Sequence, residues 1–216
     1  MNKTTDYYNS AAESYFQSTE GADFTEAYER FLKYVPKGGR IMDAGCGSGR
    51  DAAAFNRKGY LAEGIDTSAE LARLAKENFG IKVTVCNMAN WRANHPYDGI
   101  WCCASLLHLS DDEIQAFFRN LQGNLTSSGT FFLSVKTGIE TGYDNKGRYM
   151  RNFTECELRK LIKTAGLIIR EYWLTEDKLN RSGFRWINVI AACDPAGLPC
   201  RNCLTGAGLR PVHLSY

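Results

Sequence analysis

The sequence predicts a doubly wound α/β domain with a mainly parallel, seven-stranded sheet and helices on both faces. Apolar segments of strand length alternate with segments of helical periodicity along most of the 216 residues, and a glycine-rich turn at 43–50 follows the first strand. Such alternation favours parallel strands joined by right-handed crossovers. Ligands of such sheets bind at the carboxyl ends of the strands, so we expect the functional residues there.

The first half of the chain predicts three helices and three strands. A helix over 24–35 carries apolar residues at helical spacing and ends at Pro36. A strand over 39–44 leads into the glycine-rich turn and then into an alanine-rich helix over 50–58. The same order continues with a strand over 60–65, a helix over 68–79 and a strand over 81–86.

The second half contains two helix starts with recognisable caps. Ser110 and Glu113 form a capping-box pattern ahead of apolar residues at helical spacing, and Thr154 opens another helix that Gly166 ends. Strands are predicted over 97–104, 130–135, 167–174 and 184–192. A glycine-rich polar loop is predicted over 137–152.

The length predicts one domain over residues 1–193. The periodic pattern stops at Asp194, so we expect residues 194–216 to form a disordered or loosely docked tail. Cysteine and histidine residues in and beside this tail match no common zinc module, so no metal site is expected; they are Cys193, Cys200, Cys203 and His213.

Composition excludes several classes of protein. Lys plus Arg number 26 against 24 for Asp plus Glu, so no large positive field favours DNA, RNA or anionic lipid. No apolar run reaches the roughly 18–20 residues that span a bilayer, so we expect a cytoplasmic protein without a membrane partner. Cysteines in strand-like segments are interpreted as reduced thiols. A monomer or a homodimer is expected.

The glycine-rich turn, Asp43 to Arg50, is the most informative segment. Its glycines permit positive φ angles and let backbone amides approach a ligand. Gly45, Gly47 and Gly49 are spaced G-x-G-x-G, which departs from the G-x-G-x-x-G pattern of pyrophosphate-binding turns and disfavours a nicotinamide-dependent dehydrogenase. Asp43 repels a pyrophosphate but accepts hydrogen bonds from an ammonium group, so the expected cofactor carries an amine.

Asp66 ends the second strand. A carboxylate in that position of a doubly wound fold accepts hydrogen bonds from the two hydroxyls of a ribose. The turn and this acid together predict a cofactor that contains a nucleoside.

These motifs resemble those of the class I S-adenosylmethionine-dependent methyltransferases, especially their small bacterial tellurite-resistance-like members. The resemblance covers roughly residues 5–193 and also includes residues 97–101 and 104–108. It implies S-adenosylmethionine as cofactor and S-adenosylhomocysteine as product. The cofactor-binding residues that it implies are Tyr15, Asp43, Gly45, Cys46, Gly47, Ser48, Gly49, Arg50, Asp66, Thr67, Asn87, Met88 and Ala104.

Within that resemblance, Asp43, Gly45 and Gly47 surround the methionine part and Asp66 binds the ribose. Asn87 and Met88 lie near the adenine, although the family commonly has Asp at the position of Asn87. The tyrosine-rich opening, residues 6–16, resembles a lid over the cofactor and equally fits a helix packed on the core.

The cofactor carries an activated methyl group, so the protein mainly has to align an acceptor with it. His108, just beyond the fourth strand, is a candidate proton acceptor. The loop over 137–152 resembles a substrate cap, and Arg148, Arg151 and Arg185 are candidates for binding an anionic acceptor. A small-molecule acceptor is therefore expected, and the resemblance suggests a metalloid oxyanion.

Two other functions remain open at this stage. The chain lacks the Asp/Asn-Pro-Pro-aromatic motif of enzymes that methylate amino groups in nucleic acids. Enzymes that methylate a carbon of pyrimidines use a Pro-Cys nucleophile at the same place, but no proline precedes Cys102 or Cys103. A compact methyltransferase acting on RNA or protein nevertheless fits the sequence. A noncatalytic protein that binds S-adenosylmethionine fits as well.

Overall fold

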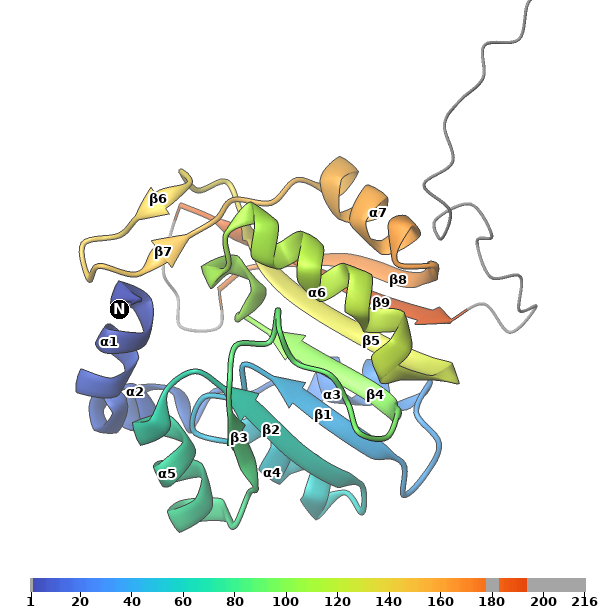
Figure 1. Ribbon diagram of the computed structural model, residues 1–216, viewed down its shortest axis with the longest axis horizontal. Helices are drawn as coiled ribbons and strands as arrows, with labels where there is room; N and C mark the ends of the chain where they lie inside the picture. Colours follow the sequence, from blue (N-terminus) through green and yellow to red (C-terminus); the bar gives the residue numbers. More distant parts are fainter. Residues whose placement is uncertain (1, 178–182, 194–216) are drawn as a thin grey trace, which may run out of the picture.

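A seven-stranded sheet forms the centre of the computed structural model, which describes residues 2–177 and 183–193 (Figure 1). The strand order is β3-β2-β1-β4-β5-β9-β8. Five strands, β1 to β5, pair in parallel, whereas β9 runs antiparallel to both β5 and β8. The predicted fold class is confirmed. The strands are β1 (Arg40–Ala44), β2 (Leu61–Asp66), β3 (Val83–Val85), β4 (Tyr97–Cys103), β5 (Leu125–Thr137), β8 (Leu167–Thr175) and β9 (Arg185–Cys193).

Helices cover both faces of this sheet. Side chains of α6 and α7 share one buried cluster with the sheet, and those of α3 and α4 share another on the opposite face. Caps fix several ends as the sequence predicted: Ser110 and Glu113 form the capping box of α6, and Thr154 caps α7. The helices are α1 (Lys3–Ser10), α2 (Ala12–Thr19), α3 (Thr25–Leu32), α4 (Arg50–Arg57), α5 (Ala69–Phe79), α6 (Asp111–Asn124) and α7 (Glu155–Thr164), with a 3₁₀ turn, η1 (Leu106–His108).

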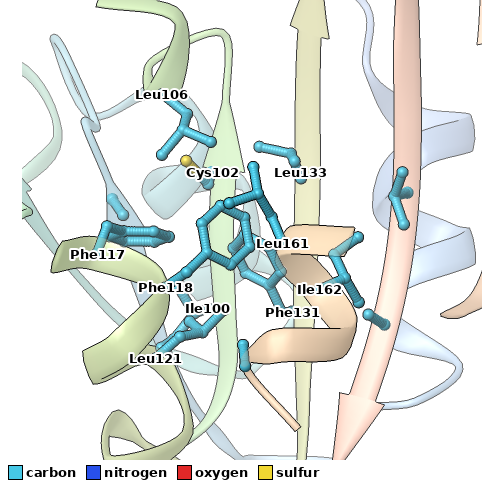
Figure 2. Packing of buried hydrophobic residues seen from close by; sticks show 14 of the residues in the cluster. Ile100, Cys102, Leu106, Phe117, Phe118, Leu121, Phe131, Leu133, Leu161 and Ile162 are labelled. Carbon is cyan, nitrogen blue, oxygen red and sulfur yellow. The ribbon is translucent and has the colours of Figure 1, made fainter. Parts of the chain in front are cut away.

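The core follows from the alternation of side chains along β4. Ile100 and Cys102 point to the face covered by α6 and α7, where Phe118 and Leu161 pack over them (Figure 2). Trp101 points to the other face and stacks on Phe132, with 3.7 Å between ring centroids. Both faces of the sheet are therefore buried, as expected for parallel strands that read as continuous apolar runs.

Three segments differ from the sequence prediction. β5 begins at Leu125, directly after α6, and not at residue 130, because Leu125 already pairs with Tyr97 of β4. A register shift separates this pair from the regular pairing that starts at Thr130, so residues 125–129 show no alternating apolar pattern. The predicted loop over 137–152 contains a small hairpin of β6 (Gly142–Tyr143) and β7 (Tyr149–Met150), whose two-residue strands are too short to give a sequence signal. The opening of the chain, where a helix over residues 6–16 was one of the two expectations, is helical but divides into two helices, α1 and α2.

The predicted tail, residues 194–216, lies outside the described residues. The same holds for Cys200, Cys203 and His213, so the expectations for them stay predictions. Among the helices of residues 2–177 and 183–193, none combines the length and the hydropathy needed to cross a membrane.

Candidate functional site

The glycine-rich turn between β1 and α4 is held by packing as well as by its conformation. Gly45 has a φ of +76°, and a Cβ placed there would lie 2.2 Å from the Cβ of Ser105. Gly49 has a φ of +82° and caps α4, where a Cβ would lie 2.9 Å from the Cβ of Ala75. Larger residues are therefore excluded at both positions. Gly47, with a φ of +54°, faces the ring of Tyr15.

Asp66 lies at the carboxyl end of β2, beside this turn. The backbone N–H of Gly47 donates to its Oδ2 and the N–H of Ser68 donates to its Oδ1, each at 2.8 Å. Burial raises the pKa of Asp66 although these N–H groups oppose the shift. Each carboxylate oxygen keeps a lone pair for a further donor, which is what the hydroxyls of a ribose require.

A cavity opens between the turn and Asp66, and we call it the glycine-loop cavity. Eight of the predicted cofactor-binding residues line it: Tyr15, Gly45, Gly47, Asp66, Thr67, Asn87, Met88 and Ala104. Asn87 donates from Nδ2 to Glu113 at 2.7 Å and accepts the N–H of Ala89 at 2.9 Å. Its amide is thus oriented by the start of α6 and by the turn after β3.

Asp43 lies beneath the turn, buried to 2% exposure. Among the described residues, its Oδ2 is the buried side-chain atom without a hydrogen-bond partner. Burial, together with the neighbouring Asp51, raises the pKa of Asp43 well above its usual range. An unpartnered acceptor in this place fits the α-ammonium group of S-adenosylmethionine, which supplies both a donor and a compensating charge, directly or through water.

The remaining predicted members of the cofactor site lie apart from the glycine-loop cavity. Cys46 turns its sulfur toward Gly64, and Ser48 is buried. Arg50 instead lines a second cavity. Cys46, Ser48 and Gly49 therefore shape the turn and do not line the space beside it.

Arg50 belongs to a buried ion-pair network that sequence reasoning missed. Asp51 accepts from Arg50 Nε at 2.6 Å, from the Tyr28 hydroxyl at 2.7 Å and from Trp101 Nε1 at 2.8 Å. Although burial disfavours its charge, these donors hold the pKa of Asp51 below its usual range. The guanidinium of Arg50 also lies 4.3 Å from the ring centroid of Phe24. The one feature of the sequence that indicated this network was Asp51, the acidic residue directly after Arg50.

The second cavity, which we call the aromatic cavity, lies at the same edge of the sheet. Its walls include the rings of Phe24, Trp173 and Trp186, with the polar groups of Ser134 and Asn188 between them. Because β9 is antiparallel, its first residues lie beside the carboxyl ends of β5 and β8. The two cavities adjoin at shared lining residues, namely Tyr8, Tyr15, Cys103, Ala104 and His108.

His108 lies at this junction with both ring nitrogens engaged. Nδ1 is 2.7 Å from the carbonyl oxygen of Tyr149, and Nε2 is 2.9 Å from the hydroxyl of Tyr8. Burial lowers the pKa of His108 to about 4, so the imidazole is neutral at pH 7. Tyr8 comes from α1 and was not singled out from the sequence, because nothing in the chain indicates that residues 8 and 108 meet.

The two candidate arginines differ in their surroundings. Arg148 lines the aromatic cavity but donates to Asp144 Oδ2 from Nε at 2.9 Å and from Nη2 at 2.6 Å. Arg185 is exposed at the start of β9 and is absent from the lining of that cavity. The structure thus brings Arg148, and not Arg185, to the site.

Comparison with known proteins identifies the kind of domain that contains this turn. Residues 41–129, which contain the turn and Asp66, match a family model described as a methyltransferase domain. An uncharacterized methyltransferase of Staphylococcus carnosus is 24% identical over 71% of this chain and 78% of its own length. A ubiquinone biosynthesis O-methyltransferase of Xanthomonas campestris is 30% identical over 45% of this chain and 43% of its own length.

Solved structures share the whole architecture. A 1,6-didemethyltoxoflavin-N1-methyltransferase of Burkholderia thailandensis, with its substrate and S-adenosylhomocysteine bound, gives a TM-score of 0.73 at 21% identity, covering 89% of this chain and 88% of that one. A TehB-like S-adenosylmethionine-dependent methyltransferase of Corynebacterium glutamicum gives 0.65 at 17% identity, covering 88% and 98%. The tellurite-resistance-like subgroup stays a prediction, since such likeness shows only the fold.

Proposed function

We propose that the chain, which is a class I S-adenosylmethionine-dependent methyltransferase, methylates an O–H or N–H group of an uncharged, flat aromatic small molecule. The observation that carries the proposal is the aromatic cavity. Phe24, Trp173 and Trp186 offer ring faces and edges for a flat acceptor, and Asn188 and Ser134 offer a small number of polar contacts.

Charge in the aromatic cavity favours a neutral acceptor over an anion. Arg50 is paired with Asp51, and Arg148 is paired with Asp144. The ammonium of Lys136 lies 4.1 Å from the ring centroid of Phe184, the residue before β9. The earlier expectation of an anionic acceptor rested on Arg148, Arg151 and Arg185. Arg148 is paired with Asp144, and neither Arg151 nor Arg185 lines the aromatic cavity.

The comparisons support a small acceptor with a nitrogen or oxygen to be methylated. The Burkholderia protein is an N1-methyltransferase with 1,6-didemethyltoxoflavin bound, and the Xanthomonas relative is an O-methyltransferase of ubiquinone biosynthesis. Both are small-molecule enzymes by name.

The residues of the glycine-loop cavity divide the work of holding the cofactor. S-adenosylmethionine supplies a methyl group on a positively charged sulfur. In this proposal Asp66 accepts from the ribose hydroxyls, Asp43 compensates the ammonium, and Asn87 and Met88 border the adenine. Tyr15 and Ala104 lie at the junction of the two cavities, so they border the path of the methyl group and help to exclude water.

Isothermal titration calorimetry tests the cofactor assignment. Wild type should bind S-adenosylmethionine and S-adenosylhomocysteine, and Asp66→Ala should weaken both at least about tenfold, because a charge-assisted hydrogen bond contributes roughly 1.5–3 kcal/mol. Asp112→Ala, a change of an exposed carboxylate on α6, is the matched control and should bind as wild type does. Equal affinities for Asp66→Ala and wild type would remove Asp66 from the site.

An acceptor panel tests the substrate class. Catechol, 8-hydroxyquinoline and xanthine represent neutral aromatic O–H and N–H groups, and selenite and tellurite represent oxyanions. We expect methylated product, measured by mass spectrometry, from the aromatic members. Methylation of selenite or tellurite alone would contradict the proposal and restore the oxyanion expectation.

A further inference from the structure

We propose that the hydroxyl of Tyr8 is a catalytic group that takes the proton of the acceptor and passes its own proton to His108. This inference rests on the proposed function, because an uncharged O–H or N–H acceptor must lose a proton when it is methylated. Tyr8 lies on α1, and His108 lies in η1, after β4. Both line the glycine-loop cavity and the aromatic cavity, so they lie where acceptor and cofactor meet.

The hydrogen bonds of His108 fix the direction of this transfer. A carbonyl oxygen can only accept, so the contact of 2.7 Å with Tyr149 places the proton of the neutral ring on Nδ1. Nε2 then carries a lone pair, and at 2.9 Å it accepts the hydroxyl proton of Tyr8. His108 is therefore a base whose lone pair is already directed at Tyr8.

This arrangement blocks direct proton abstraction by His108. An acceptor that reached Nε2 would have to displace Tyr8, whose ring lies edge-on to the imidazole with 5.4 Å between centroids. In the hydrogen-bonded pair of Tyr8 and His108, the group that an acceptor can reach is instead the hydroxyl oxygen of Tyr8. Burial raises the pKa of Tyr8, so a lasting phenolate is disfavoured and one proton has to arrive as the other leaves.

Arg148 positions the oxygen of Tyr8 and stabilises negative charge on it. Its Nη1 lies 3.4 Å from the hydroxyl, a long contact that shortens if charge develops on the oxygen. Two other nitrogens of the guanidinium are held by Asp144. The charged groups that act on His108 are Arg148 and Lys136, which disfavour the imidazolium, and Asp144, which favours it.

The step balances in atoms and charge. A lone pair of the acceptor forms the bond to the methyl carbon as the carbon–sulfur bond breaks, and the electron pair stays on sulfur. The acceptor proton moves to Tyr8 Oη, and the Tyr8 proton moves to His108 Nε2. One positive charge leaves the sulfur and one appears on the imidazole, so the site gains no net charge. Because the pKa of His108 is low, the imidazolium then gives its proton back to Tyr8, which passes one to water.

Three variants separate this role from packing. Tyr8→Phe keeps the ring and removes the hydroxyl, and His108→Gln keeps an acceptor for Tyr8 but cannot hold the proton. Tyr7→Phe is the matched control, because Tyr7 neighbours Tyr8 on α1 but lines neither cavity.

The first measurement is nuclear magnetic resonance of His108 in complexes with S-adenosylhomocysteine. In wild type and Tyr7→Phe we expect the Nδ1–H tautomer and an unusually low pKa. In Tyr8→Phe the His108 pKa should change, because Nε2 loses its donor. An unchanged titration of His108 in Tyr8→Phe would overturn the proposal without reference to any acceptor.

The second measurement is the single-turnover rate with an acceptor that wild type methylates. Tyr8→Phe and His108→Gln should each lose about 100-fold or more, with Kd for S-adenosylhomocysteine within about twofold of wild type, and the double variant should be no slower than either one. The solvent deuterium isotope effect of wild type should vanish in Tyr8→Phe. Rates within about threefold of wild type, or losses that multiply in the double variant, would contradict the transfer. If wild type methylates no panel member, the proposed function fails, while the titration of His108 still decides whether Tyr8 donates to it.

Discussion

At the scale of single residues, Asp43 combines a cost in stability with a role in binding. A buried carboxyl beside Asp51, with one oxygen unpartnered, is destabilising when ionised. We expect Asp43→Asn to leave the ligand-free protein at least as stable as wild type at pH 7, as measured by thermal unfolding. Stabilisation by S-adenosylhomocysteine should decrease strongly in the variant.

The dependence of the unfolding free energy on pH tests this account of Asp43. Its raised pKa means that the folded state binds more protons than the unfolded state, so the Asp43 contribution to stability falls as pH rises above the usual range of a carboxyl. Asp43→Asn should remove that part of the dependence. A variant that unfolds more readily than wild type at pH 7 would show that the ionised carboxylate is paired.

His108 makes the opposite contribution. Its pKa falls from 6.5 to about 4, so the unfolded state binds more protons between these values and stability decreases as pH falls from about 6.5 to about 4. The loss is on the order of 3 kcal/mol at 1.36 kcal/mol per pKa unit. His108→Gln should flatten the dependence of the unfolding free energy on pH in this window. If denaturant titrations gave wild type and His108→Gln the same dependence of unfolding free energy on pH, the lowered pKa of His108 would be contradicted.

At the scale of elements, the turn between β1 and α4 is fitted to η1. Ser105 donates to the carbonyl of Ala44 at 2.6 Å and lies where a side chain on Gly45 would point. Gly45→Ala should therefore destabilise the protein by about 2 kcal/mol more than Gly59→Ala. Gly59 is the matched control, because its φ is +86° and open space surrounds it, so the comparison isolates the clash from backbone strain. If denaturant unfolding showed equal losses of unfolding free energy for Gly45→Ala and Gly59→Ala, Ser105 would have to move aside without cost.

A hydrogen bond joins the hairpin of β6 and β7 to α1. The N–H of Tyr149, on β7, donates to the hydroxyl of Thr4, on α1, at 2.9 Å, and the hairpin lies beside α1 in Figure 1. Thr4→Val keeps the shape of the side chain and removes the acceptor, at a cost of about 1 kcal/mol. Hydrogen exchange at Tyr149 should become faster, whereas exchange in β4 should not change. Unchanged protection at Tyr149 would mean that another group holds the hairpin.

At the scale of the whole molecule, the regular alternation of strand-like and helical segments made the fold predictable. Strand and helix alternation gave the sheet, and caps such as Ser110 and Thr154 gave helix ends within a few residues. The start of β5 and the hairpin of β6 and β7 depend on pairing with distant strands, which no local pattern records.

The site was only partly predictable for the same physical reason. Asp66 ends β2, and Gly47 and His108 come shortly after the ends of β1 and β4, so their place at the carboxyl edge of the sheet was readable from the order of elements. Tyr8 and Asp51 matter through partners that lie far away in sequence. Arg185 lies outside the lining of the aromatic cavity, and the start of an antiparallel strand gives no sign in the sequence of which way a side chain faces. The roles of these residues stay predictions until the variants are measured.

The domain boundary also stays a prediction and can be tested on a shortened chain. A protein that ends at Ala196 keeps all of β9 and should bind S-adenosylhomocysteine with the affinity of the full chain. At 100 times Kd, the ligand should stabilise both proteins by about 2.7 kcal/mol in thermal unfolding. A shortened chain that folds but binds more weakly would place part of the site in residues 197–216.

The position of β9 has a consequence for protein synthesis. β9 is made after every other described strand, yet it inserts between β5 and β8 and brings Asn188 and Trp186 to the wall of the aromatic cavity. A chain released early by the ribosome therefore lacks the strand between β5 and β8, and with it Trp186 and Asn188 of that wall, however well its first part has folded. Incomplete translation products that end just before β9 should therefore lack part of the proposed acceptor site, although every residue that lines the glycine-loop cavity has been made.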